Sequence, residues 1–185
     1  MKKNITNIKF IFIYRSFLYK FIKFKTKNQD LEKIVAALNI KNRKKRITYI
    51  YDEAIEEINN YYSKDLCQFI NNKCIAARKN KHNKINGCCR LCIYQNNEGC
   101  KVNNLACKLF YCNSALANFK QLDFESLTIL KCLSKSQRFI LKSDYFSTRE
   151  EVINDLYYGI IIATFRLLIR QIKQFIYRRI NKIKP

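Results

Sequence analysis

The cysteines of this chain are concentrated in one short segment. Of the nine cysteines in 185 residues, eight lie within 46 consecutive positions: Cys67, Cys74, Cys88, Cys89, Cys92, Cys100, Cys107 and Cys112. Cysteines that serve only as small buried apolar side chains have no reason to cluster in this way. The apolar periodicity of helices and strands is missing from the same segment, so it lacks the means to build an ordinary core. We therefore expect the cysteines themselves to hold it together.

The spacing of these cysteines is typical of a thiolate-bound metal. Cys89 and Cys92 form one close pair, and Cys107 and Cys112 form a second pair after a loop of 14 residues. Each pair places two sulfurs on one side of an ion, and the loop brings the pairs together. Metal–sulfur bonds would also stabilise a segment that has little apolar core. The sequence therefore predicts a cysteine-ligated metal ion.

The partition of the cysteines among sites stays open at this point. In one arrangement a second four-thiolate site uses the remaining members, Cys67, Cys74, Cys88 and Cys100. In another, an iron–sulfur cluster is held by four thiolates such as Cys92, Cys100, Cys107 and Cys112. Zinc and iron–sulfur clusters both prefer sulfur, so the ligand type does not choose between them. The expected cofactor is zinc or an iron–sulfur cluster.

Two further residues, His82 and Cys132, have side chains that can bind metal. His82 is the only histidine and lies in a strongly basic run, so we expect a solvated loop residue. Cys132 lies on an apolar helical stripe, and we expect it in the core. Two alternatives to a metal are disfavoured. The odd number of cysteines opposes a disulfide framework, and no strand-to-helix frame supports a redox-active CxxC pair.

The charge of the chain indicates anionic partners. Its formal net charge is +22, from 36 Lys and Arg against 14 Asp and Glu. Such an excess favours an anionic membrane surface or nucleic acid. Lys, Ile, Asn, Tyr and Phe all have A- and T-rich codons, so a biased genome would supply part of this charge. Nucleic acid is therefore the less favoured of the two partners.

The composition predicts a mainly α fold. One Pro and three Gly are too few for a turn-rich sandwich or barrel. We expect a small helical protein with an irregular Cys-rich metal-binding insert. Residues 1–46 would form a basic N-terminal segment, poorly ordered or interfacial. Residues 47–185 would form a single helical domain that contains the cysteine cluster at 67–112.

Three helices are predicted within that domain. The first covers Tyr49–Tyr62, where Ile50, Ala54, Ile58 and Tyr61 recur at three- and four-residue steps. The second lies within Ser114–Leu133. The third is long and amphipathic. It begins at a capping box, either Ser147–Glu150 or Thr148–Glu151, and runs to about Asn181.

The C-terminal helix carries a long apolar stripe. Its members follow a 4-3-4-3 spacing and are Ile161, Phe165, Leu168, Ile172 and Phe175. We expect this stripe to pack against the body of the protein, with association along a membrane surface as the alternative. The longest uncharged run, Leu156–Phe165, is too short to span a bilayer. The N-terminal apolar run is interrupted by lysine and arginine, so we expect neither a signal peptide nor a membrane span there.

The cysteine segment resembles a known family. Gly87-Cys88-Cys89-Arg90, the Cys92–Cys100 stretch with Gly99, and the box Cys107-Lys108-Leu109-Phe110-Tyr111-Cys112 are similar to the cysteine pattern of YkgJ-type proteins, a family of zinc- or iron-chelating domains. The resemblance covers about residues 67–112. It departs from the family where Ala106 precedes the last box and in the spacing of Cys67 and Cys74. It implies a chelating site and no particular reaction.

The sequence thus favours a cysteine-ligated metal-binding protein that acts as a scaffold, sensor or accessory factor. We expect it in the cytoplasm, with peripheral membrane association as an extension of that location. The alternative is a basic amphipathic module that binds an anionic membrane surface or nucleic acid, in which the metal is purely structural. An enzyme that uses the metal or cluster is a third alternative. The chain offers no Ser–His–Asp set, phosphate loop or histidine-based metalloprotease motif, so no particular reaction is predicted.

Overall fold

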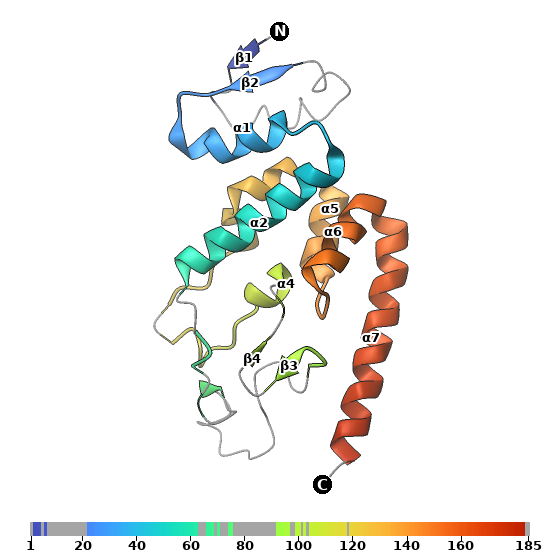
Figure 1. Cartoon of the computed structure of the whole chain (residues 1–185). Coiled ribbons are helices and arrows are strands. Elements are labelled where there is room, and N and C mark those ends of the chain that lie inside the picture. The colour runs from blue at the N-terminus through green and yellow to red at the C-terminus, as the bar shows by residue number, and fades with distance from the viewer. Residues whose placement is uncertain are drawn as a thin grey trace.

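The computed structural model describes residues 2–4, 6, 22–62, 66–68, 70, 74–75, 92–96, 99–100, 102, 104–117 and 119–183. These residues are mainly helical, as the sequence predicted (Figure 1). The α-helices described are α1 (Glu32–Asn39), α2 (Arg43–Tyr61), α4 (Leu105–Lys108), α5 (Lys135–Ser143), α6 (Arg149–Tyr158) and α7 (Ile160–Ile183). Three 3-10 turns accompany them: η3 (Gln29–Leu31), η4 (Phe124–Ser126) and η5 (Thr128–Cys132).

Two short strand pairs complete the described elements. β1 (Lys2–Asn4) pairs in parallel with β2 (Lys23–Lys25), and β3 (Gln95–Asn96) pairs antiparallel with β4 (Gly99–Cys100). The second pair sets Cys100 opposite Gln95. None of the helices in the described ranges combines the length and the apolar character that crossing a bilayer requires.

Helix α2 is the centre of the fold. Its N-cap Asn42 accepts a hydrogen bond from the backbone N–H of Lys45, which satisfies one of the amides exposed at a helix start. Ile50, Ala54 and Ile58 are fully buried along one face, as their spacing predicted, whereas Tyr61, the fourth member of the predicted stripe, is 44% exposed. The helix begins at Arg43, earlier than predicted, because the cap lies at Asn42. Against α2 pack α1, α6 and the η5 turn (Figure 1).

The hydrophobic core extends across the boundary that the sequence suggested at residue 46. Phe24 and Ile34 are buried in the same cluster as the apolar face of α2. The side chain of Asn39 accepts a hydrogen bond from the Phe24 amide at 2.9 Å and donates one to the Phe24 carbonyl at 3.0 Å. These bonds attach β2 to the end of α1. Residues 7–21, which belong to the segment expected to be poorly ordered or interfacial, lie outside the described residues.

The helix predicted within Ser114–Leu133 is wrong. The described residues of this region form a turn around Ala115, extended backbone and the two 3-10 turns η4 and η5. Ser126 donates from both its amide and its hydroxyl to the carbonyl of Asp123, and such local bonds compete with an α-helix. The hydroxyl of Tyr62 accepts a hydrogen bond from the Leu122 amide at 2.5 Å, which holds the extended part against the end of α2.

The predicted C-terminal helix is present but divided. Thr148 and Glu151 form the capping box that starts α6, which settles the choice between the two predicted registers. Gly159 then ends α6 with φ of 98°, a value that favours glycine, and α7 begins at the next residue. From there α7 runs beside α5 and α6 and continues past the β3–β4 pair (Figure 1).

Candidate functional site

The structure brings two of the predicted metal ligands into neighbouring segments. The amide of Ile75 donates to the carbonyl of Cys67 at 2.9 Å, so the backbone next to Cys74 lies beside Cys67. Cys74 and Cys92 are buried. Cys67, Cys107 and Cys112 are half-buried.

Cys107 is held by a buried polar side chain. Asn104 caps α4 by accepting the Cys107 amide at 2.9 Å. The side-chain amide of Asn104 donates to the carbonyls of Asp144 and Ser147, at 2.8 and 3.2 Å. These three bonds fix α4 against the loop that joins α5 to α6. The position of Cys107 is therefore coupled to the body of the protein.

The structure leaves the predicted metal site untested. In the ranges it describes, no group of three or more His, Cys, Asp or Glu side chains is placed to hold a metal ion. Cys88, Cys89 and His82 lie outside those ranges, and only the backbone of Cys100 is described. The metal site stays a prediction. Cys132 packs against the core, as predicted.

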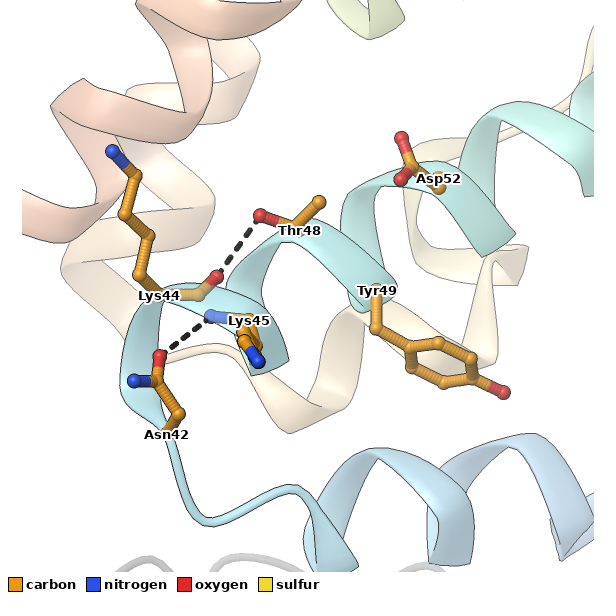
Figure 2. A pocket seen from close by; sticks show the side chains of 6 residues that line it. All are labelled: Asn42, Lys44, Lys45, Thr48, Tyr49 and Asp52. Atoms are coloured by element: carbon orange, nitrogen blue, oxygen red, sulfur yellow. Dashed lines mark hydrogen bonds between the residues drawn. The ribbon is translucent and has the colours of Figure 1, made fainter.

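A hollow of about 590 Å³ lies along the first turns of α2 (Figure 2). It is lined by Asn42, Lys44, Lys45, Thr48, Tyr49 and Asp52. The side chains diverge in Figure 2, with the ring of Tyr49 turned away from the two lysines. Arg149 engages both carboxylate oxygens of Asp52, at 2.7 and 2.6 Å. The hollow therefore has no set of polar groups that converges on one point.

The most unusual surface belongs to α7. Ile161 is 85% exposed and Phe165 is 67% exposed, and the same face continues along the helix. Its exposed apolar members are Ile161, Ile162, Phe165, Leu168, Ile169, Ile172, Phe175, Ile176 and Ile180. We call these residues the α7 stripe. The prediction that it packs against the body is wrong.

The opposite face of α7 contacts the body instead. Ala163, Leu167 and Gln174 are buried there, and the side chain of Arg170 is only 10% exposed. The Gln174 side-chain oxygen accepts a hydrogen bond from the amide of Ile93 at 3.1 Å. The buried face of α7 therefore combines apolar and polar side chains.

A cluster of charged groups explains this orientation. The carboxylate of Asp155 on α6 is fully buried and bonds both Arg170 and, at 3.2 Å, Arg166. Asp144, also buried, accepts the hydroxyl of Ser147 and lies 3.4 Å from Arg170. Buried carboxylates need such partners, and turning the stripe inward would remove them.

Burial alters the ionisation of this cluster. It raises the pKa of Asp144 to about 6, although the Ser147 hydroxyl and the Arg170 charge oppose the rise. The sequence analysis did not identify this cluster. The signal available was an aspartate among apolar residues of the preceding helix, at Asp155 between Val152 and Leu156.

A second hollow, of about 350 Å³, lies where α6 meets α7. Its lining residues are Glu151, Asn154, Arg166, Ile169, Arg170 and Lys173. Three cations thus face one carboxylate around a small cavity, and Ile169 also belongs to the α7 stripe. Comparison with protein-family models, with curated proteins and with solved structures gives no significant match to this chain.

Proposed function

We propose that this protein is a peripheral binding module that docks α7 on an anionic membrane surface. The observation that carries the proposal is the α7 stripe, an exposed apolar face on a helix of 24 residues. The same helix contains six Lys and Arg residues and no Asp or Glu. A long amphipathic helix with an apolar face and a basic flank is suited to lie in the interface of an anionic bilayer.

The arrangement of α7 suits this role without any unfolding. The helix is about 36 Å long. Its polar face stays bonded to Asp155 while the stripe points away from the body. Burial of apolar surface yields about 25 cal/mol per Å², and each Lys or Arg near an anionic leaflet adds about 1 kcal/mol. Nine exposed apolar side chains and several cations together are enough for reversible binding.

Two other occupants fit the stripe less well. Its 4-3 spacing also suits a coiled coil with a second copy of the chain. In such a dimer the Lys and Arg residues of the two α7 helices would lie near each other, and α7 has no Asp or Glu to pair with them. Like charges across an interface oppose association. Nucleic acid would neutralise the cations but would leave the aliphatic members of the stripe in water. An anionic bilayer surface attracts the cations of α7 and also removes its apolar face from water.

The absence of tryptophan from the chain offers a direct test. Phe165→Trp places a single indole in the stripe, and its emission should shift to the blue when anionic phospholipid vesicles are added. Tyr49→Trp on α2 is the control and should show no shift. Binding should weaken as salt is raised, since screening reduces the contribution of the cations.

A matched pair of variants separates apolar from charge effects. Leu168→Glu interrupts the stripe, whereas Gln171→Glu adds the same charge to the same helix outside the stripe. In the Phe165→Trp background, the first should weaken vesicle binding by about tenfold or more relative to the second. Equal effects of the two variants, or no blue shift in any anionic vesicle, would contradict docking through the stripe.

The cysteines support a second candidate function. We propose that Cys67, Cys74, Cys88, Cys89, Cys92, Cys100, Cys107 and Cys112 supply the thiolates for zinc or an iron–sulfur cluster. The contact between the segments of Cys67 and Cys74, and the cap that fixes Cys107, favour this proposal. The resemblance to YkgJ-type proteins points the same way. A bound metal would cross-link the irregular segment.

Metal quantification after anaerobic purification tests this candidate. We expect stoichiometric zinc or iron in the wild-type protein, and a visible absorption band if the metal is an iron–sulfur cluster. Cys107→Ser should lower the metal content, whereas Cys132→Ser, at a residue packed against the core, should not. Reduced, folded protein without stoichiometric metal would refute the metal site and would leave the proposal for α7 intact.

A further inference from the structure

The hollow between α6 and α7 opens beside the α7 stripe. Arg166, Arg170 and Lys173 follow one another by four and three residues, so they share one side of α7. Ile169 lines the same hollow and is itself a member of the stripe. A molecule with an anionic group and an apolar portion could therefore occupy the hollow and the stripe at once.

Several hydrogen-bond donors around this hollow are unused. Lys173 is exposed and makes no ion pair within the part of the chain that the structure describes. The side-chain amide of Asn154, on α6, likewise has no hydrogen bond to a described residue. The Nε–H of Arg170 is buried without a hydrogen-bond partner among the described residues. These groups come from two helices and line one cavity.

The carboxylates near the hollow already have partners. Glu151 accepts the Thr148 amide at 2.7 Å and the Tyr94 hydroxyl at 3.4 Å. Asp155 is bonded to Arg166 and Arg170. Among the described residues, Lys173 is the lining cation without an ion pair, and Glu151 is the lining carboxylate. The hollow therefore favours an anion that can accept several hydrogen bonds.

We infer that this hollow binds the phosphate of an anionic lipid headgroup whose acyl chains lie against the α7 stripe. The inference rests on the proposed docking of α7 and names the chemical group that the docked helix recognises. Lys173 and Asn154 donate to the phosphate oxygens, and Arg166 adds charge from the same side. Guanidinium and ammonium groups suit phosphate because its oxygens accept several charge-assisted hydrogen bonds. Ile169 marks the passage from the headgroup to the acyl chains.

The test compares two vesicles of equal surface charge. In one, phosphatidic acid supplies the negative charge, and in the other oleate supplies it, both in phosphatidylcholine. Binding is followed by the emission of Phe165→Trp in the full chain. We expect about tenfold tighter binding to phosphatidic acid, the size that one hydrogen bond to a charged group provides.

Two substitutions locate this preference in the hollow. Asn154→Ala leaves the net charge unchanged and should abolish the preference for phosphatidic acid. Asn60→Ala, at an exposed position of α2, is the control and should have no effect. Glu151→Gln keeps a side chain able to cap α6 and removes the negative charge of Glu151 from the hollow, so it should strengthen the preference.

The outcomes separate this inference from the proposed function. Equal binding to the two vesicles, or an Asn154→Ala variant that keeps the preference, overturns the phosphate site and leaves docking through the stripe standing. Binding to neither vesicle refutes both. Displacement by inorganic phosphate at constant ionic strength, with no preference between vesicles, would assign the hollow to free phosphate and overturn the lipid as its source.

Discussion

Arg170 on α7 bonds the carboxylate of Asp155 on α6, whose side chain is completely buried. This pair determines which face of α7 meets the body. A surface helix usually buries its apolar face and exposes its charges. Here a buried carboxylate requires a cation, so the charged face turns inward and the α7 stripe is left in solvent. The exposure of the α7 stripe is therefore a consequence of an ion pair in the core.

Removal of Arg170 should strongly destabilise the fold. Arg170→Met removes one of the two arginines bonded to Asp155 and the cation that lies 3.4 Å from Asp144. Uncompensated buried charge costs about 3 kcal/mol or more in the free energy of unfolding. Urea unfolding followed by circular dichroism measures this loss. Arg179→Met, an exposed arginine of the same helix, should change the free energy by less than about 0.5 kcal/mol. Similar losses in both variants would show that the buried pair does not stabilise the fold.

The raised pKa of Asp144 gives stability a defined pH dependence. Its folded value of about 6 lies above the ordinary value of 3.8, because burial opposes its charge. The neighbouring charges are Arg170 from α7 and Asp155 and Glu151 from α6. Because the pKa of the Asp144 carboxyl is higher in the folded protein than in the unfolded chain, protonation of this group stabilises the fold. The stabilisation is complete at pH values below the unfolded pKa, and it is lost as the pH rises through the folded pKa.

Asp144→Asn should remove that dependence. Between pH of about 5 and about 8, the variant should gain about 1 kcal/mol in unfolding free energy relative to wild type. Urea titrations at the two pH values measure the difference. Asp30→Asn replaces an exposed carboxylate and serves as the control. If the difference between Asp144→Asn and wild type is the same at both pH values, Asp144 does not titrate in this range.

Gly159 should resist substitution for reasons of backbone geometry alone. Its φ of 98° and ψ of 179° belong to a region that only glycine adopts easily. A Cβ added there meets no atom within 4 Å, so steric contact adds nothing. Gly159→Ala should therefore cost about 1–3 kcal/mol in unfolding free energy. Thr164→Ala, at an exposed position in the helix that follows, should cost far less. If Gly159→Ala leaves the free energy of unfolding unchanged, α6 and α7 can be joined in another backbone geometry.

Features of this fold that depend on residues close together in the sequence could be predicted from local sequence patterns. Ile50, Ala54 and Ile58 were predicted to face the core because helix periodicity alone brings them together, and all three are buried. The capping box of Thr148 and Glu151 was one of the two registers predicted for the same reason. A cap is a contact between residues three apart, so it needs no knowledge of the tertiary structure.

The orientation of α7 depends on partners that no local pattern reveals. The spacing of Phe165, Leu168 and Ile172 predicted an apolar face correctly, but the direction of that face depends on Asp155 and Asp144. The helix expected within Ser114–Leu133 failed similarly, because bonds of Asp123 to Ser126 and of Tyr62 to Leu122 replace helical ones. The spacing of the cysteine pairs predicts thiolate ligands. Whether the pairs meet at one ion depends on the tertiary structure, which spacing alone does not establish.

Asn104 should matter more than its role as the cap of a one-turn helix suggests. It is buried and makes three hydrogen bonds, one to the Cys107 amide and two to the loop between α5 and α6. Asn104→Ala leaves two carbonyls and one amide without these partners, and each buried orphan costs about 1–3 kcal/mol. We expect a loss of about 3 kcal/mol in unfolding free energy.

Asn42→Ala is the matched control for this prediction. Asn42 also caps a helix, α2, but it is exposed and accepts a single bond from the Lys45 amide. Water can replace that bond, so the loss should be about 1 kcal/mol. Urea unfolding of the two variants compares an exposed cap with a buried one. Equal losses would mean that the contacts of Asn104 with the α5–α6 loop contribute nothing, and that α4 and Cys107 are held in place by apolar packing of Leu105 instead.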